Sequence, residues 1–194
     1  ELMGGNFSKP IEKYEYNNLG QETLLQLVEE DGSIFININM KYEKNNIVEL
    51  SFTNKEDKLQ ELSVLGVNTG TPYAIGRFTF NEKGLLLKKS YYDKNGKLFN
   101  GEIGYAYVVN DYDKQGRIIR QELYDKDGNI AESTVGKWSV AINNYDEKGN
   151  LIEQSYYAKN GALAQTPWNW SRRLQKYDEL GKCTPMYLSI SDNL

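Results

Sequence analysis

The side chains best suited to bind a ligand are four aromatic residues that recur every 32 or 33 positions: Tyr73, Tyr105, Trp138 and Trp170. Aromatic rings in a regular row can stack on the rings of a ligand, or they can pack together as a core. The residue after each ring is small, namely Ala74, Ala106, Ser139 and Ser171. Small residues beside rings favour packing, with each ring over the small residue of an adjacent repeat.

A second tryptophan departs from this spacing. The segment Pro167-Trp168-Asn169-Trp170 adds Trp168 outside the repeat pattern, so we expect Trp168 to be exposed and free to bind. The candidate ligand contacts are therefore Trp168 first, followed by the column residues Trp170, Trp138, Tyr105 and Tyr73.

Catalytic chemistry finds little support in the composition. The 194-residue chain contains no histidine, which removes Ser-His-Asp and Cys-His nucleophilic sites, His-based zinc sites and the commonest general base. Residues 133–138 (STVGKW) resemble a phosphate loop but have the wrong spacing, with Trp138 where Ser or Thr is required. Acidic residues are abundant, yet no pair stands out as glycosidase-like. We predict a non-enzyme with no catalytic residue and no cofactor.

The acidic segment Asp125-Lys126-Asp127-Gly128 resembles the middle of a calcium-binding EF-hand loop. The first ligand of such a loop would be Leu123 and the last would be Thr134, so the ligand set is incomplete. We therefore predict no metal site and assign these acids to turns.

A short motif organises the chain: an aromatic residue, Asp or Asn, two variable residues, then Gly. Its copies begin at Phe80, Tyr92, Tyr112, Tyr124, Tyr145, Tyr157 and Tyr177, with steps of 12, 20, 12, 21, 12 and 20 residues, and the copy at Tyr157 has Ala158 in place of the Asp. Asp or Asn accepts backbone hydrogen bonds at the start of a turn, and Gly closes it in the left-handed conformation. The motif predicts turns at residues 81–84, 93–96, 113–116, 125–128, 146–149 and 158–161.

The segments between turns have the pattern of strands. Residues 34–42 alternate with a period of two, and residues 22–29 fall on a strand in the repeat register despite their helix propensity. A helical turn is expected within residues 57–65. The fold class predicted is all-β, with tandem antiparallel β-hairpins forming an extended, twisted or spiralling sheet.

One repeat domain accounts for most of the chain. It covers residues 11–183 as about five 32-residue units with an insertion near residues 57–72. Residues 1–10 are expected to be loose, and residues 184–194 to form a C-terminal cap.

Charge and hydropathy limit the partners and the location. The net charge of −4 is spread along the chain, which argues against nucleic-acid binding. No apolar run reaches the length of a membrane span, and the single cysteine, Cys183, cannot form an internal disulfide. A secretion signal could have been removed, and a lipid anchor would require a further N-terminal segment.

The motif copies Tyr145-Asp146-Glu147-Lys148-Gly149 and Tyr112-Asp113-Lys114-Gln115-Gly116, followed by Asn-Leu and Arg-Ile, resemble the YD repeats of RHS-type bacterial proteins and of bacterial surface lipoproteins. The resemblance covers about residues 70–183 and implies strips of β-hairpin on a secreted or cell-surface protein. The two-turn period is longer here, and no toxin or self-cleaving segment is evident. Residues 90–101 also resemble the hairpins of choline-binding and cell-wall-binding repeats, without their Gly-Trp dipeptide.

Three functions remain open at this stage. The favoured one is a non-catalytic bacterial surface or secreted repeat protein whose sheet binds a macromolecule, either a protein or a glycan. The second is a carbohydrate-binding or cell-wall-binding module that uses its aromatic side chains. The third is a structural spacer.

The incomplete ligand set generates a first prediction. The thermal midpoint should be unchanged when millimolar calcium is added after EDTA treatment, because a cation stabilises a fold only if the folded state binds it. Differential scanning fluorimetry measures this, and a substantial rise of the midpoint would contradict the assignment of the acids to turns.

Overall fold

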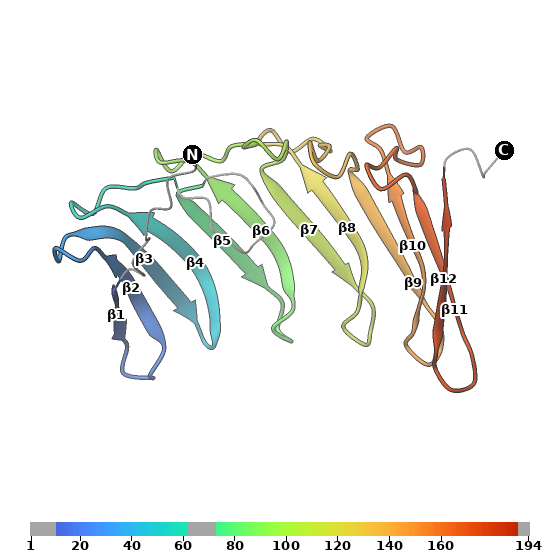
Figure 1. Ribbon diagram of the computed structural model, residues 1–194, viewed down its shortest axis with the longest axis horizontal. Coiled ribbons are helices and arrows are strands. Elements are labelled where there is room, and N and C mark those ends of the chain that lie inside the picture. Colours follow the sequence, from blue (N-terminus) through green and yellow to red (C-terminus); the bar gives the residue numbers. More distant parts are fainter. Residues whose placement is uncertain (1–10, 62–72, 190–194) are drawn as a thin grey trace, which may run out of the picture.

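The computed structural model describes residues 11–61 and 73–189, which form twelve β-strands in one antiparallel sheet with no helix in these ranges (Figure 1). The strands are β1 (Ile11–Tyr16), β2 (Glu22–Val28), β3 (Ile34–Glu43), β4 (Asn46–Thr53), β5 (Ile75–Phe80), β6 (Leu86–Tyr92), β7 (Tyr107–Tyr112), β8 (Ile118–Tyr124), β9 (Val140–Tyr145), β10 (Leu151–Tyr157), β11 (Arg172–Tyr177) and β12 (Cys183–Leu188). The prediction of an all-β protein built from tandem antiparallel hairpins is confirmed.

The sheet is a single layer. Spatial order follows sequence order from β1 to β12, and each described strand contacts only its neighbours in sequence. The strands rotate steadily from one end of the sheet to the other, as Figure 1 shows, in keeping with the ordinary twist of β-sheets. No second sheet or helix covers either face within the described residues.

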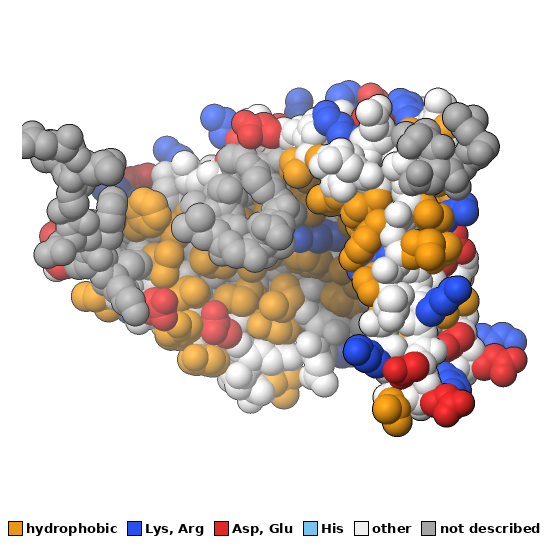
Figure 2. Space-filling model, turned by 45° about the vertical axis from the view of Figure 1, so that its right-hand side comes forward, with side chains coloured by type: hydrophobic (Ala, Val, Ile, Leu, Met, Phe, Trp, Pro, Cys, Tyr) orange, Lys and Arg blue, Asp and Glu red, His pale blue; other side chains and the backbone are white. Residues whose placement is uncertain are grey.

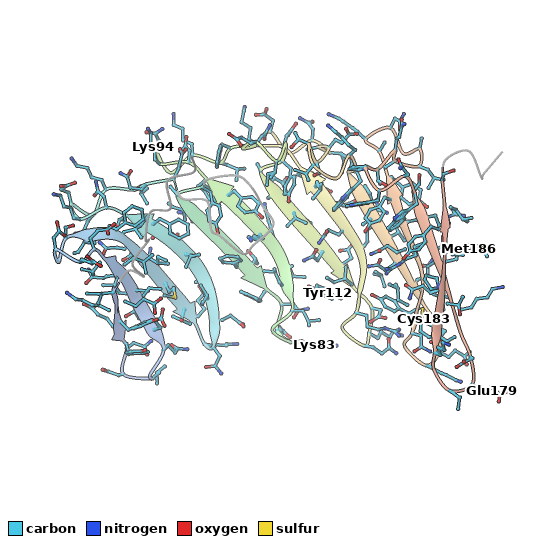
Figure 3. All side chains as sticks on the ribbon, in the orientation of Figure 1. Lys83, Lys94, Tyr112, Glu179, Cys183 and Met186 are labelled. Carbon is cyan, nitrogen blue, oxygen red and sulfur yellow. The ribbon has the colours of Figure 1, made fainter. Side chains whose placement is uncertain are left out.

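The two kinds of step in the motif correspond to the two edges of the sheet. Lower turns, residues 81–84, 113–116, 146–149 and 178–181, join the two strands of each hairpin. Upper connections, residues 93–106, 125–139 and 158–171, lead from one hairpin to the next (Figure 1). Lys83 and Glu179 mark the lower edge in Figure 3, and Lys94 marks the upper edge.

All six predicted turns are confirmed. They share the backbone bonds that close them, and in every copy except the one at Ala158 the Asp or Asn side chain also accepts backbone amides. In the turn that begins at Asp113, Oδ1 accepts from the amides of Gln115 and Arg117, both at 2.9 Å. The Gly116 amide donates to the Asp113 carbonyl at 3.1 Å, and Gly116 has a φ of 82°. Such a φ is costly for residues with a side chain, which explains the glycine in the motif.

The three turns on the upper edge are less regular hairpins than the sequence predicts. After each of them the chain returns for a single bridge only: Tyr92 to Leu98, Tyr124 to Ile130 and Tyr157 to Leu163. The chain then leaves the sheet plane for the remainder of the upper connection. The motif therefore specifies the turn, and the residues after it decide whether a strand follows.

The structure describes part of the segments at the two ends of the predicted repeat domain and at its insertion. Residues 22–28 form β2, as the repeat register predicts. Residues 57–61, expected to begin a helical turn, instead follow a β-turn and contain the bridge from Thr53 to Leu59. Residues 184–188, expected in a C-terminal cap, belong to β12. Residues 1–10, 62–72 and 190–194 lie outside the described residues.

The small-residue column has a backbone role at the junctions between hairpins. The Ala106 amide donates to the Tyr124 carbonyl within its own hairpin at 2.7 Å, and the Ala106 carbonyl accepts from Tyr91 of the preceding hairpin at 2.9 Å. The other three members bridge the corresponding pairs of strands, and all four are at most 1% exposed: Ala74, Ala106, Ser139 and Ser171. A larger side chain has no room at this junction.

In three repeats, the tyrosine that precedes the lower turn forms a hydrogen bond to the preceding hairpin. The Tyr112 hydroxyl donates to the Leu86 carbonyl at 2.8 Å, from β7 to the start of β6 (Figure 3). Tyr145 makes the same bond to Ile118 at 3.0 Å, and Tyr177 makes it to Leu151 at 3.0 Å. These bonds explain why three copies of the motif carry tyrosine at this position.

The turn aspartates generate a prediction about pH. A backbone hydrogen bond from Lys97 is the main cause that lowers the pKa of Asp93, one from Asn129 lowers the pKa of Asp125, and the Asn150 side chain lowers that of Asp146. Because these folded-state values lie below the unfolded value of about 3.9, their contribution is present above that pH and is lost as the pH falls through the lower folded values. We expect the urea midpoint to fall from pH 5 to pH 3.

The copy that lacks the acid provides the test. Ala158 replaces Asp, and the Asn160 side chain instead caps the Ala162 amide at 3.0 Å. Ala158→Asp should stabilise the fold by roughly 0.5–1 kcal/mol at pH 7 by adding one or two hydrogen bonds. The gain should shrink at pH 3, as urea denaturation at both pH values would measure. An equal gain at both values would contradict the role of the ionised acid.

Candidate aromatic binding site

A row of rings crosses the sheet close to the upper connections. The rings of Phe52, Tyr73, Tyr91 and Tyr105 form successive contacts with centroids 5.5, 5.3 and 6.1 Å apart. A second set runs from Trp138 through Tyr156 and Trp170 to Tyr187, at 5.6, 5.5 and 5.3 Å. Leu123 stands between the two sets, at the repeat position that Tyr91 and Tyr156 occupy. The column rings thus pack against aromatic residues of neighbouring strands.

Burial decreases along this row toward the C-terminal strands. Tyr73 is 3% exposed and belongs to a core cluster with Ile36, Phe52, Tyr91 and Ile103. The later column residues Tyr105, Trp138 and Trp170 are partly buried. Trp168 and Tyr187 are 48% and 52% exposed. The predicted ligand contacts therefore divide: Tyr73 is core, Tyr105 and Trp138 are partly buried, and Trp168 and Trp170, on the connection between β10 and β11, belong to the more accessible end of the row.

The accessible rings line a cleft of about 340 Å³ over the last three strands. Figure 2, in which these strands come forward, shows hydrophobic side chains gathered over this end of the molecule. The cleft is lined by Gln154, Tyr156, Trp168, Trp170, Arg173 and Tyr187.

The strand register fixes the floor of the cleft. Gln154 on β10 lies directly opposite Arg173 on β11, which lies directly opposite Tyr187 on β12. Residues directly opposite one another point to the same face of a sheet, so the three side chains form one row. Tyr156, two residues along β10, shares that face.

The upper connection that follows β10 places the tryptophans above this row. The Trp168 ring contacts Tyr156 and Trp170, with centroids 5.4 and 5.8 Å apart. The connection is held by hydrogen bonds from Thr166 Oγ1 to the Trp170 carbonyl and from the Asn169 amide to the Thr166 carbonyl. The predicted exposure of Trp168 is confirmed, and its contacts assign it to the same cleft as Trp170.

The residue before each column ring adopts a left-handed backbone in three repeats. Gly104, Lys137 and Asn169 have φ values of 89°, 56° and 60°. This conformation turns the chain back toward the sheet just before the ring. This column is not evident in the sequence because Gly, Lys and Asn share no chemistry, although Gly and Asn are the residues that favour the left-handed region.

Residues 133–138, which resemble a phosphate loop, instead hold Trp138. The Ser133 amide donates to the Trp138 carbonyl at 2.9 Å, and the Gly136 amide donates to Ser133 Oγ at 3.0 Å. A Cβ on Gly136 would lie 2.6 Å from Cδ1 of the Trp138 ring, so only glycine fits there. The Thr134 amide also donates to the Ile103 carbonyl, which joins two upper connections.

Arg173 and Tyr156 are the residues of the cleft that carry its electrostatics. Burial raises the pKa of the Tyr156 hydroxyl, and the positive charge of Arg173 opposes that shift. Nε of Arg173 is buried, and no hydrogen-bond partner for it lies among residues 11–61 and 73–189. Arg173 was not among the predicted ligand contacts, although it stands where the other repeats have Gly76, Val108 and Ala141.

Other chemistry is sparse in the described part of the chain. No group of three or more His, Cys, Asp or Glu side chains that could hold a metal ion is present there. Cys183 forms no disulfide, and its sulfur lies 3.0 Å from Gln175 Nε2. Within the same ranges, no helix has the length and hydropathy needed to cross a membrane.

The comparison with known proteins yields structural similarity alone. Neither a family profile nor a curated protein matches the chain. The chain is similar to part of the crystal structure of TcdB2-TccC3, with a TM-score of 0.58 and 11% sequence identity, over 98% of this chain and 9% of that one. The chain thus spans less than a tenth of the structure it matches.

Two related structures align less well. They are the TcdB2-TccC3-Cdc42 crystal structure, with a TM-score of 0.41 and 10% identity, and a Tc holotoxin pore of Photorhabdus luminescens with a mutated TccC3, with a TM-score of 0.40 and 12% identity. They cover 94% and 91% of this chain and 10% of each matched chain. At the level of the fold, the TcdB2-TccC3 similarity agrees loosely with the resemblance to YD repeats.

The contrast between two tryptophans generates a third prediction. Trp138→Ala should cost about 3 kcal/mol of unfolding free energy, because a large partly buried ring leaves a cavity against Tyr156. Trp168→Ala should cost within about 0.5 kcal/mol, because the ring is half exposed. Guanidinium denaturation of the two variants measures both changes in unfolding free energy. If Trp138→Ala is as stable as the parent protein, the column is a binding surface at that position too.

Proposed function

We propose that this chain is a non-catalytic repeat protein that binds a macromolecule outside the cell or at a bacterial cell surface. The aromatic cleft over β10 to β12 is the contact region, and Trp168 is its most accessible ring. The single observation that carries the proposal is the exposure of large rings at the C-terminal end of a ring row that is buried in the core at Phe52, Tyr73 and Tyr91.

Exposed aromatic rings are costly in water unless a partner covers them, and they are enriched at the centres of binding interfaces. Trp168 and Tyr187 are both about half exposed and lie in the same cluster. By contrast, Phe35 at the other end of the sheet is 58% exposed without an aromatic neighbour among the described contacts. A cluster with a cleft is the more specific feature.

The non-catalytic part of the proposal rests on the residue types in the cleft. Two tryptophans, two tyrosines, a glutamine and an arginine line it. Such a set can stack, donate and accept hydrogen bonds, and attract an anion, but it contains no carboxylate or imidazole to transfer a proton near neutral pH.

Two partner classes fit this surface. The TcdB2-TccC3 structure is a complex between proteins, which is compatible with a protein partner for a chain of the same fold. The cluster of rings beside polar side chains favours a glycan, because sugar rings present an apolar face with hydroxyl groups around it. A structural spacer would need neither the cleft nor its exposed rings.

Paired arrays test the proposal. The labelled chain, with its Trp168→Ala and Phe35→Ala variants, is applied to a glycan array and to an array of extracellular peptides. We expect a signal on at least one array that falls about tenfold with Trp168→Ala and is unchanged with Phe35→Ala, an exposed ring at the distant end. Silence on both arrays would favour the structural spacer.

A further inference from the structure

The positive charge in the aromatic cleft has no carboxylate partner among residues 11–61 and 73–189. Four of the five arginines pair with a carboxylate: Arg77 with Glu49 at 2.8 Å, Arg117 with Asp113 at 2.6 Å, Arg120 with Glu122 at 2.6 Å and Arg172 with Glu153 at 3.1 Å. Arg173 is the exception among the described residues. A guanidinium at the floor of an aromatic cleft, with Nε already removed from water, is suited to an anion from outside.

The lining residues of the cleft restrict the charge of the ligand. No Asp or Glu is among them, so no carboxylate of the described residues neutralises Arg173 within the cleft. An aromatic cage for a cation such as choline depends on the negative faces of the rings, and the adjacent guanidinium opposes such a ligand. The charge therefore selects an anionic group, and a planar guanidinium fits a carboxylate with two parallel hydrogen bonds.

The remaining groups indicate what the carboxylate is attached to. The rings of Tyr156, Trp168 and Trp170 lie 5.4–5.8 Å apart, which offers apolar surface for the face of a saturated ring. Gln154 donates its amide to Asn143 at 3.1 Å, so its carbonyl oxygen can accept a hydroxyl proton. The volume of about 340 Å³ lies at the lower end of small-ligand clefts.

We propose that the cleft of Tyr156, Trp168, Trp170, Arg173 and Tyr187 binds an acidic sugar, with its ring stacked on tryptophan and its carboxylate on Arg173. The ligand class is a uronic acid, either at the end of a polysaccharide or within it. This inference rests on the proposed function and names its ligand. A peptide would instead be recognised most readily through main-chain bonds along a sheet edge, whereas these side chains lie on the face.

The test compares a carboxylate with its ester on the same sugar. Tryptophan fluorescence and calorimetry measure binding of trigalacturonic acid and of its methyl ester, with oligomers of glucuronic and mannuronic acid as further probes. The parent protein should bind one of these acids roughly tenfold more tightly than the corresponding ester, the size expected for one charge-assisted interaction. Added salt should weaken binding of the acid and leave binding of the ester nearly unchanged.

Variants separate the contribution of the Arg173 charge from that of the stacking ring of Trp168. Arg173→Gln should remove the preference for the acid, and Arg173→Lys should retain part of it because the charge remains. Trp168→Ala should weaken both ligands about tenfold. Arg120→Gln, which removes a guanidinium paired within the sheet, and Phe35→Ala, which removes a distant exposed ring, are the matched controls and should leave both affinities unchanged. Denaturation midpoints confirm that each variant is folded.

Each result of these binding measurements either supports or overturns the assignment of an acidic sugar. Equal binding of acid and ester, or an acid preference that survives Arg173→Gln, overturns the carboxylate assignment. No binding of any saccharide overturns the inference, while an array signal on peptides that depends on Trp168 would leave the proposed function standing. A dimer in sedimentation analysis that Trp168→Ala dissociates would show that a second copy covers the cleft, and would also overturn the inference.

Discussion

From β4 onward, the junction between successive hairpins has the shortest strand pairing in this sheet, and the rest of the structure depends on how it is reinforced. The strands of one hairpin pair over six residues, as β7 and β8 do, whereas β6 and β7 of adjacent hairpins pair over three. The bonds from Tyr112, Tyr145 and Tyr177 supply a side-chain donor where the ladder between hairpins has ended. The buried small-residue column allows the backbones to meet at the other end of the junction. The small-residue column and the tyrosines of the lower turns therefore both stabilise the junction between successive hairpins.

A single-layer sheet joined in this way buries rings only between neighbours. Tyr73 has an aromatic neighbour on each side, Phe52 and Tyr91, and is fully part of the core. The rings over β12 have a neighbour on one side only. The same column is therefore structural within the array and accessible at its C-terminal end, where Trp168 adds a ring that the packing of the repeat does not require.

The sequence predicts the local features of this fold well, because they depend on neighbouring residues. A glycine with positive φ closes each turn, and in every copy but the one at Ala158 an Asp or Asn side chain accepts backbone amides, so the turn positions follow from the motif. The exposure of a column ring depends on whether another ring lies two strands away in the sheet, and the motif does not specify this. Arg173 was detectable in principle as the one charged residue in the column of Gly76, Val108 and Ala141, but its missing partner becomes evident only when strand register places Gln154 and Tyr187 beside it.

The outer edge of β12 bears on whether the cleft stays open. The Asp178 amide donates to the Lys182 carbonyl across the last turn, and hydrogen-bonded pairs alternate along an antiparallel ladder. By that alternation, the pair of Gln175 and Pro185 is not hydrogen-bonded, and the nitrogen of Pro185 faces away from β11. A strand added outside β12 would find no donor there, which is how edge strands commonly resist further pairing. Because Tyr187 lies only two residues farther along β12, the same proline disfavours an added strand beside the Tyr187 side of the cleft.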